Sequence, residues 1–459
     1  MFVVNPYKDW LLQLSNLFYE KKIVRFGNES FSANDLLARR NAACALLKKN
    51  NIIKGNHVAI IEHNSIEFVI ELLSIWAIGA IPVPINLRLS EKEISEQLKF
   101  VDAKLAFSSL GNNQIPNIFE NFKVIRSGII NNQNLAVEKL SWEIEPISTA
   151  LLMFTSGSSG NAKCVELTFQ NLISSAESVI KFLNPENNDS WLTSLPFYHI
   201  GGFSIIIRAF LSGNVLSIPK FSTFENISDI IEKGKANYIS LVPTTLQRLL
   251  DAGTFPHKSI KTIFLGGARV PLHLVNNALK RGYKLTTVYG STETASMIAA
   301  DEVGEIAVKS PSIAKGYFNN PKETKRKFHR ENKGRLDYYL TSDLGKVDEH
   351  GHLFVLGRKD DVIISGGENI STSEITDKIK SLKEVADAFA FGLNDTQWGE
   401  KLVAAVVLRK LSGRELKNQL KELLPGYKMP KEIFIVNEIP RTSLGKVIKE
   451  KLLSLLIIK

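Results

Sequence analysis

The chain has 459 residues, more than one hydrophobic core usually organises, so we expect two or more domains. Hydrophobic residues make up 44% of it and charged residues 23%, which is ordinary for a globular enzyme. The formal net charge of +10 is spread along the chain without a long basic run. This pattern argues against nucleic-acid binding and suits small anionic ligands.

Cysteine usage and the N-terminus indicate a cytoplasmic protein. Cys44 and Cys164 lie far apart in the sequence, so they form neither a metal cluster nor a disulfide framework, and a reducing compartment is expected. The first ten residues lack the basic and apolar regions of a signal peptide. The longest apolar run, 72–85, is interrupted by Pro82 and Pro84 and is too short to span a membrane, so no stable membrane insertion is expected.

Helical and strand patterns alternate over residues 31–100. A strand is predicted at His57 to Ile61, and a helix from Glu67 to the glycine at 79. Such alternation favours an α/β domain with a largely parallel sheet. Between Leu105 and Trp142, short apolar runs separated by Asn-rich turns predict loop and edge structure only.

A phosphate-binding loop is predicted in residues 151–168, LLMFTSGSSGNAKCVELT. A buried strand over 150–154 leads into a stretch of Thr, Ser and Gly that ends near Lys163. Glycines allow backbone N–H groups to converge on an anion, hydroxyls add donors, and the lysine adds a positive charge. A flexible surface turn is the alternative. The spacing excludes the common loop in which a glycine and four residues precede Gly-Lys-Ser/Thr.

A helix is then predicted over 171–182, followed by the turn WLTSLPFYHIGG at 191–202, which contains His199. This histidine is either a core residue or part of a site. The next predicted helix, 203–211, carries Arg208 on an apolar face. A buried arginine needs a negative partner, which is either an acid of the protein or a carboxylate of a substrate.

Two further stretches have the composition of a nucleotide and acyl site. The strand IFLGGA at 263–268 ends at Gly266 and Gly267, where a flat ligand could approach the backbone, although a tight turn would look the same. In TVYGSTET at 287–294, Tyr289 offers a face for adenine, Thr292 a hydroxyl for phosphate and Glu293 an oxygen ligand for Mg²⁺. An ordinary loop with a helix cap is the alternative there.

A second domain is predicted after residue 360. Strands at 387–392 and 401–408 and helices at 374–381 and 414–424 are enough for a small α+β unit. The fold class is therefore α/β, with a large N-terminal domain of mixed sheets flanked by helices (1–359) and a small α+β C-terminal domain (360–459).

Taken together, the loop at 155–163, TVYGSTET, the string YYLTSDLGKVDEHGHLFVLGRKDDVIISGGENIS from residue 338, and IPRTSLGK at 439–446 resemble the adenylate-forming superfamily. This superfamily includes acyl- and aryl-CoA ligases, luciferases and the adenylation domains of peptide synthetases. Two departures stand out. Ala162 and Cys164 flank the lysine where Pro-Lys-Gly is usual, and Thr-Ser-Asp ends at Asp343 where Thr-Gly-Asp is usual.

The resemblance implies roles for individual residues. It makes Lys446 the adenylation lysine, Asp360 the hinge of a mobile C-terminal domain, and the Gly366-Gly367 loop part of a CoA channel, with Glu293 as metal ligand. His199 and Glu293 join Lys446 as catalytic residues, and His199, Arg208, Gly266 and Gly267 would bind the acid. The residues implied in binding ATP are Thr155, Ser156, Gly157, Ser158, Ser159, Gly160, Lys163, Tyr289, Gly290, Thr292, Asp343 and Arg358.

The implied reaction uses ATP, Mg²⁺ and CoA to convert a carboxylic acid to its thioester through an acyl-adenylate. The PFYHIGG turn, the LGGA strand and the ISGGENIS loop are most similar to the o-succinylbenzoate–CoA ligases of menaquinone and phylloquinone synthesis. Arg208 would then face the non-reacting carboxylate of an aromatic dicarboxylate. Another acyl- or aryl-CoA ligase, or an amino-acid adenylation enzyme that loads a carrier protein, is the alternative. The sequence leaves self-association into a homo-oligomer open.

Overall fold

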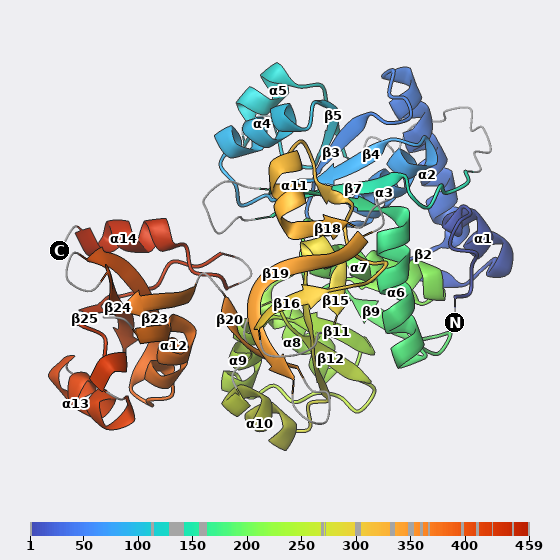
Figure 1. Ribbon diagram of the computed structural model, residues 1–459. Helices are drawn as coiled ribbons and strands as arrows, with labels where there is room; N and C mark the ends of the chain where they lie inside the picture. Colours follow the sequence, from blue (N-terminus) through green and yellow to red (C-terminus); the bar gives the residue numbers. More distant parts are fainter. Residues whose placement is uncertain are drawn as a thin grey trace.

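In the computed structural model, the chain folds into two bodies, a large N-terminal one and a small C-terminal one (Figure 1). Among the residues described, no helix is long and apolar enough to cross a membrane. The described residues are 2–111, 114–127, 142–155, 163–267, 270, 272–298, 304–330, 336–347, 353–358, 361–365, 368–395, 399–409, 413–424, 426–442 and 445–457.

A seven-stranded sheet forms the centre of the large body, in the order β13-β12-β11-β9-β10-β1-β2. Its neighbouring strands are parallel except for β2, which pairs with β1 in the antiparallel sense. The loops after parallel strands therefore gather at one edge, where ligands bind in open α/β sheets. The strands are β1 (Lys22–Phe26), β2 (Glu29–Ser32), β9 (Ser190–Leu192), β10 (Val215–Ile218), β11 (Tyr238–Leu241), β12 (Thr262–Leu265) and β13 (Leu285–Thr287).

A second, parallel sheet has the order β4-β3-β5-β6. The prediction of a strand at His57 to Ile61 is confirmed, but the prediction of only loop and edge structure after Leu105 is wrong. Residues 105–107 are fully buried in β5, between β3 and β6, because their short apolar run is covered on both faces. The strands are β3 (His57–Ile61), β4 (Ile81–Pro84), β5 (Ala103–Ser108) and β6 (Val124–Arg126).

Antiparallel strands complete the large body. The hairpin of β7 (Thr149–Thr155) and β8 (Lys163–Thr168) is extended by β17 (Gly316–Tyr317) on the β8 side. A further sheet runs β16-β19-β18, with β20 also paired to β19, and a separate ribbon joins β14 to β15. These strands are β14 (Tyr289–Ser291), β15 (Ser296–Ile298), β16 (Gly304–Val308), β18 (Phe328–Arg330), β19 (Leu336–Val347) and β20 (Leu353–Arg358).

Helices cover the sheets of the large body, and their starts follow local capping signals. Ser32 and Ser90, for example, form reciprocal capping boxes with the acidic residues three positions on. The apolar helix α3 is buried on nearly all sides, and its Trp76 donates a 2.7 Å hydrogen bond to the Ala150 carbonyl in β7. The helices are α1 (Trp10–Leu17), α2 (Ala33–Lys49), α3 (Ile66–Ala77), α4 (Glu91–Phe100), α5 (Pro116–Asn121), α6 (Phe169–Leu183), α7 (Ile200–Ser212), α8 (Phe224–Glu232), α9 (Pro243–Asp251), α10 (Leu272–Lys280) and α11 (Pro321–Lys327).

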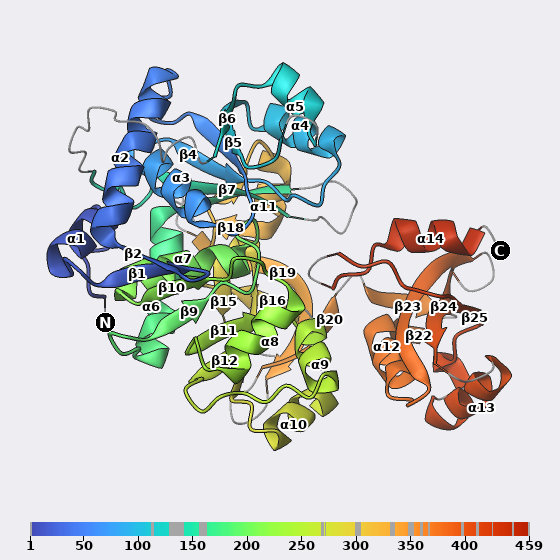
Figure 2. The same ribbon diagram turned by 180° about the vertical axis from the view of Figure 1, so that it is seen from behind.

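The small body has its own sheet, ordered β22-β21-β24-β23 with β25 paired to β24, and its own apolar clusters (Figure 2). The predicted mixed α/β fold with a smaller C-terminal domain is therefore confirmed. Residues 359 and 360 lie outside the described part, so the boundary at 360 stays a prediction. The elements are β21 (Val362–Ser365), β22 (Glu368–Ser371), α12 (Thr372–Lys380), β23 (Val385–Asp395), β24 (Gly399–Leu408), α13 (Gly413–Leu423), β25 (Glu432–Ile435) and α14 (Lys449–Ile457).

Candidate active site

The β7–β8 hairpin brackets the predicted phosphate loop. Thr155, the last residue of β7, is the cross-strand partner of Lys163, the first residue of β8, and its hydroxyl donates a 3.4 Å hydrogen bond to the Lys163 carbonyl. The two ends of the loop are thus held at neighbouring strand ends. The loop residues Ser156, Gly157, Ser158, Ser159 and Gly160 lie outside the described part of the chain, so their predicted roles stay predictions.

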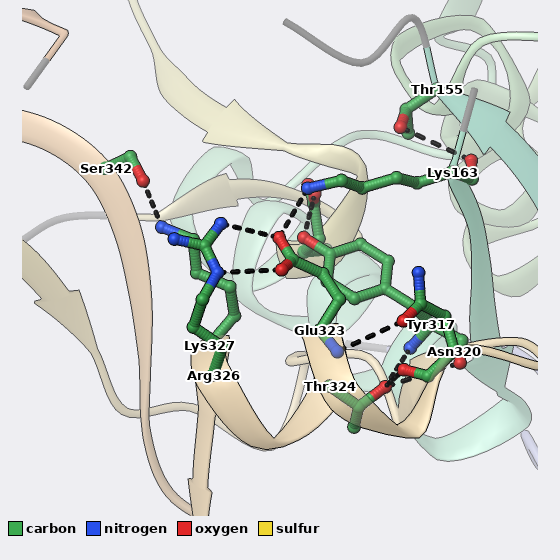
Figure 3. A network of polar contacts seen from close by, with 10 residues as sticks. Thr155, Lys163, Tyr317, Asn320, Glu323, Thr324, Arg326, Lys327 and Ser342 are labelled. Atoms are coloured by element: carbon green, nitrogen blue, oxygen red, sulfur yellow. Dashed lines mark hydrogen bonds and ion pairs between the residues drawn. The ribbon is translucent and has the colours of Figure 1, made fainter. Parts of the chain in front are cut away.

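The side chain of Lys163 points toward helix α11 (Figure 3). Its ammonium lies 2.5 Å from Oε1 of Glu323 and 5.1 Å from the ring centroid of Tyr317. Arg326 donates two further hydrogen bonds of 2.7 Å to the same carboxylate. These cations, Arg326 foremost, lower the pKa of Glu323 to about 2, so the carboxylate is ionised at neutral pH.

Glu293, the predicted metal ligand, lies in the short 3₁₀ turn Thr292–Thr294 that follows β14. Its Oε1 accepts a 2.8 Å hydrogen bond from the hydroxyl of Tyr317, and its backbone carbonyl accepts one of 2.7 Å from Ala314. Burial first, and then the nearby Glu293 charge, raise the pKa of Tyr317 well above its ordinary value, so this hydroxyl remains a donor. Tyr317 therefore links Lys163 to Glu293, the ring to one and the hydroxyl to the other.

The predicted ribose and adenine residues also lie together. The Tyr289 hydroxyl donates a 2.6 Å hydrogen bond to Oδ2 of Asp343, and Asp343 is the cross-strand partner of Arg358 in the β19–β20 pair. The preceding Ser342 has φ of +66°, a backbone region that favours glycine. This explains why glycine is usual before the aspartate, and here the Ser342 hydroxyl accepts a hydrogen bond from Lys327.

The turn that carries His199 leaves the carboxyl end of β9 and enters α7, of which His199 is the N-cap. The ring is half-buried and packs edge to face on Tyr198, with 4.7 Å between centroids. Burial, and then the positive charge of Arg88, lower the pKa of His199 to about 4, so the imidazole is neutral at physiological pH. At Gly202 a Cβ would lie 2.2 Å from the Pro196 carbonyl oxygen, so only glycine fits this turn.

Asn64, which the sequence reasoning missed, holds this turn in place. It follows β3, and its amide group donates hydrogen bonds of 3.3 and 2.8 Å to the carbonyls of Thr193 and Leu195. Its Oδ1 accepts a 2.9 Å hydrogen bond from the Phe197 backbone N–H. A polar residue three positions after the end of a buried parallel strand was the available signal, because such positions lie near the ligand edge of a sheet.

The remaining predicted acid-binding residues are spread more widely. Arg208 is fully buried on α7, with its guanidinium carbon 5.9 Å from the Trp191 ring centroid, and burial lowers its pKa to about 10. A Cβ at Gly266 would lie 2.9 Å from the Val288 carbonyl oxygen, so close packing of β12 requires this glycine. Gly267 has φ of +78°, which fits the tight turn that the sequence offered as the alternative to a ligand site. Their contact with an acid stays a prediction.

The loop carrying Lys446 reaches from the small body to the large one. A Cβ added to Gly445 would lie 3.5 Å from Cγ2 of Thr244 at the start of α9, so the two residues are neighbours. Arg441 fixes this loop through hydrogen bonds to the Asp387 carboxylate, of 2.8 and 2.9 Å, and to the Gly445 carbonyl, of 2.7 Å. Since α9 follows β11, the exposed Lys446 stands near the carboxyl edge of the central sheet. The hinge candidate Asp360 and the glycines at 366 and 367 lie outside the described residues.

No group of three or more His, Cys, Asp or Glu side chains forms a metal cluster within the described ranges. A single carboxylate such as that of Glu293 is nevertheless compatible with Mg²⁺, which takes one or two protein carboxylates and completes its shell with phosphate oxygens and water.

Comparison with known proteins agrees with this geometry. Residues 15–302 match the AMP-binding enzyme family and residues 374–446 match the AMP-binding enzyme C-terminal domain. The 2-succinylbenzoate–CoA ligase of Listeria innocua is 32% identical over 97% of this chain and 98% of its own, and that of Oceanobacillus iheyensis is 28% identical over 96% and 98%.

Solved structures of o-succinylbenzoate CoA synthetase from Bacillus subtilis are also similar. The complex with the acyl-adenylate intermediate has a TM-score of 0.89 at 28% identity, covering 97% of both chains. The complex with ATP and magnesium ion has a TM-score of 0.87 at 29% identity, covering 97% of this chain and 99% of the other. The chain belongs to the AMP-binding enzyme family, as an AMP-forming CoA ligase.

Proposed function

We propose that this protein converts o-succinylbenzoate to o-succinylbenzoyl-CoA at the expense of ATP, in menaquinone or phylloquinone synthesis. The observation that carries the proposal is the single network in which Tyr317 joins Lys163 to Glu293, with Tyr289 bonded to Asp343 nearby. The names of the relatives support the choice of acid. Its substrates are small molecules, and its use of ATP and CoA favours the cytoplasm.

In the first half-reaction, a carboxylate oxygen attacks the α-phosphorus of ATP, and pyrophosphate leaves. The obstacle is the repulsion between two anions. In the proposed arrangement Lys163, Thr155 and the loop hydroxyls at 156 and 158 hold the β and γ phosphates. Lys446 bridges the carboxylate and the α-phosphate, while Asp343 and Arg358 hold the ribose. Bound Mg²⁺ would neutralise phosphate charge beside Glu293.

In the second half-reaction, the thiol sulfur of CoA attacks the acyl carbon, the C–O bond to phosphate breaks, and AMP leaves as the thiol loses its proton. Lys446 has no part in this step. We propose that the small domain turns about Asp360 and brings the Gly366-Gly367 loop to the thiol. This motion would move the Lys446 loop away from Thr244, which lies beside Gly445 here.

The acid is proposed to lie between the His199 turn and the β12 end at Gly266 and Gly267. A neutral His199 suits this role, because it offers a polar wall without holding the carboxylate in an ion pair. Arg208 is the proposed partner of the second carboxylate.

A panel of carboxylic acids tests the proposal, with AMP release measured with and without CoA. We expect o-succinylbenzoate to give the highest kcat/KM and steady turnover to require CoA. Turnover of another aryl or acyl acid at higher kcat/KM would refute the choice of acid. Pyrophosphate exchange driven by an amino acid, without CoA dependence, would identify a carrier-loading enzyme instead.

A further inference from the structure

Lys163 has an anionic partner within the protein itself. Glu323 lies 160 residues farther on, and its side chain is 16% exposed against 24% for that of the lysine, so the pair is partly shielded from solvent. The Tyr317 ring below the ammonium adds a cation–π contact. The Glu323 carboxylate accepts a charge-assisted hydrogen bond from Lys163, as a phosphate oxygen would.

Glu323 is held in place on the first turn of α11. Asn320 caps this helix by accepting a 3.1 Å hydrogen bond from the Glu323 backbone N–H. Thr324 on the same turn accepts a 2.9 Å hydrogen bond from the backbone of Tyr317, which ties α11 to β17 (Figure 3). Since β17 pairs with β8, the carboxylate and the lysine are placed by one connected set of strands and a helix.

Arg326 gives Glu323 a second cation. Its guanidinium makes a bidentate contact with both carboxylate oxygens, while its own side chain is 63% exposed. If Lys163 moved to another anion, Arg326 would keep the carboxylate paired, so the departure of the lysine would not leave a half-buried charge without a cation.

We propose that Glu323 is an internal competitor for the ATP phosphates: it holds Lys163 until ATP binds, the lysine then exchanges this carboxylate for a phosphate oxygen, and Arg326 retains Glu323. The proposal rests on the proposed function, in which Lys163 binds phosphate. It makes Glu323 a positioning residue that weakens ATP binding while keeping the lysine in place.

Calorimetric titration of the full chain with Mg·ATP, in the absence of any acid, tests this directly. Glu323→Gln should lower the Kd for Mg·ATP about three- to tenfold, because Lys163 no longer has to leave a partly shielded ion pair. Arg326→Gln should raise it, because Glu323 would then hold Lys163 alone. A variant that merely loosened the fold would weaken ATP binding in both cases, so the opposite signs distinguish the two explanations.

Glu166 provides a matched control. It lies on the same strand as Lys163 and is also 16% exposed, but its carboxylate pairs with Lys315 at 2.7 Å. Glu166→Gln removes the same charge at the same exposure, so a Kd change below about twofold is expected. An equal gain from this variant would mean that negative charge in general, and not the hold on Lys163, limits ATP binding.

Double variants complete the test. The gain in Mg·ATP affinity from Glu323→Gln should disappear in a Lys163→Gln background. The loss of affinity from Arg326→Gln should disappear in a Glu323→Gln background. A gain that persists without the lysine would overturn the proposal. If the wild-type chain binds no Mg·ATP, the proposed function fails and the competitor fails with it. If the wild type binds and Glu323→Gln binds no more tightly, only the competitor is refuted.

Discussion

Replacement of Arg208 by methionine tests which acid the enzyme uses. Methionine keeps a long unbranched chain at this fully buried position and removes the charge. The pKa of Arg208, lowered to about 10 by burial, still leaves a cation at neutral pH. A charge-assisted contact between this guanidinium and the second carboxylate of o-succinylbenzoate would form in a dry environment, where such contacts are strong.

The expected loss follows from removing one partner of a buried charge pair. Such changes cost on the order of 2–5 kcal/mol, which is roughly thirty- to several-thousand-fold in kcat/KM. The assay compares o-succinylbenzoate with the two analogues that each lack one of its carboxyl groups. An analogue that the enzyme still activates has no second carboxylate for Arg208 to bind. Its turnover is slower from the start, and its kcat/KM should change far less in the variant.

The position of Arg208 supplies the competing explanation. It lies nine residues after His199, which corresponds to about 13 Å along the helix axis and about half a turn around it. In the competing explanation, Arg208 stabilises the interior of the large body beside Trp191 and does not contact the acid. Equal losses with all three acids, together with a lower midpoint of thermal unfolding, would refute substrate recognition by Arg208.

Three other substitutions test separate parts of the site. Lys446→Ala should reduce adenylate formation by orders of magnitude and leave thioester formation from supplied acyl-adenylate nearly unchanged; equal losses in both would contradict the domain motion. Asn64→Ala should lower kcat/KM for the acid about tenfold or more with little change in KM for ATP, because three backbone contacts of the turn are lost. Burial raises the pKa of Glu62 to about 7, and Ser127 joins it to Glu71. The folded state thus binds more protons than the unfolded chain between pH 4.5 and about 7, so the free energy of unfolding should fall by up to about 3 kcal/mol as pH rises through this range. Glu62→Gln should flatten that dependence in urea titrations, and an unchanged slope would exclude Glu62 as its origin.

Local patterns predicted the elements that depend on sequence neighbours. The strand at His57 to Ile61 and the helices after the phosphate loop and in the C-terminal domain have periodic apolar positions with clear ends, and the structure contains them. The strand β5 was missed because its buried run, 105–107, is short and followed by Asn-rich turns, so only the pairing with β3 and β6 defines it. Short apolar runs carry no periodicity by themselves.

Motif order predicted the nucleotide residues, but not their partners. The sequence assigned no role to Glu323 or Tyr317, and only the fold brings them to Lys163 and Glu293. Asn64 is likewise distant in sequence from the turn that it holds. Contacts between residues more than a hundred positions apart depend on the packing of whole elements, which a single sequence does not encode in its local patterns.

Cys164, which stands beside Lys163 where the family usually has glycine, has a structural explanation. Successive side chains of a strand point to opposite faces, so Cys164 points away from Lys163. It is 2% exposed within an apolar cluster, and its backbone carbonyl accepts a 2.7 Å hydrogen bond from Phe318, next to Tyr317. Burial raises the pKa of its thiol, which therefore stays protonated. Cys164 anchors β8 against the segment that carries Tyr317, so the placement of Lys163 opposite Glu323 depends on the register of this strand with its neighbours rather than on a proline and a glycine beside the lysine.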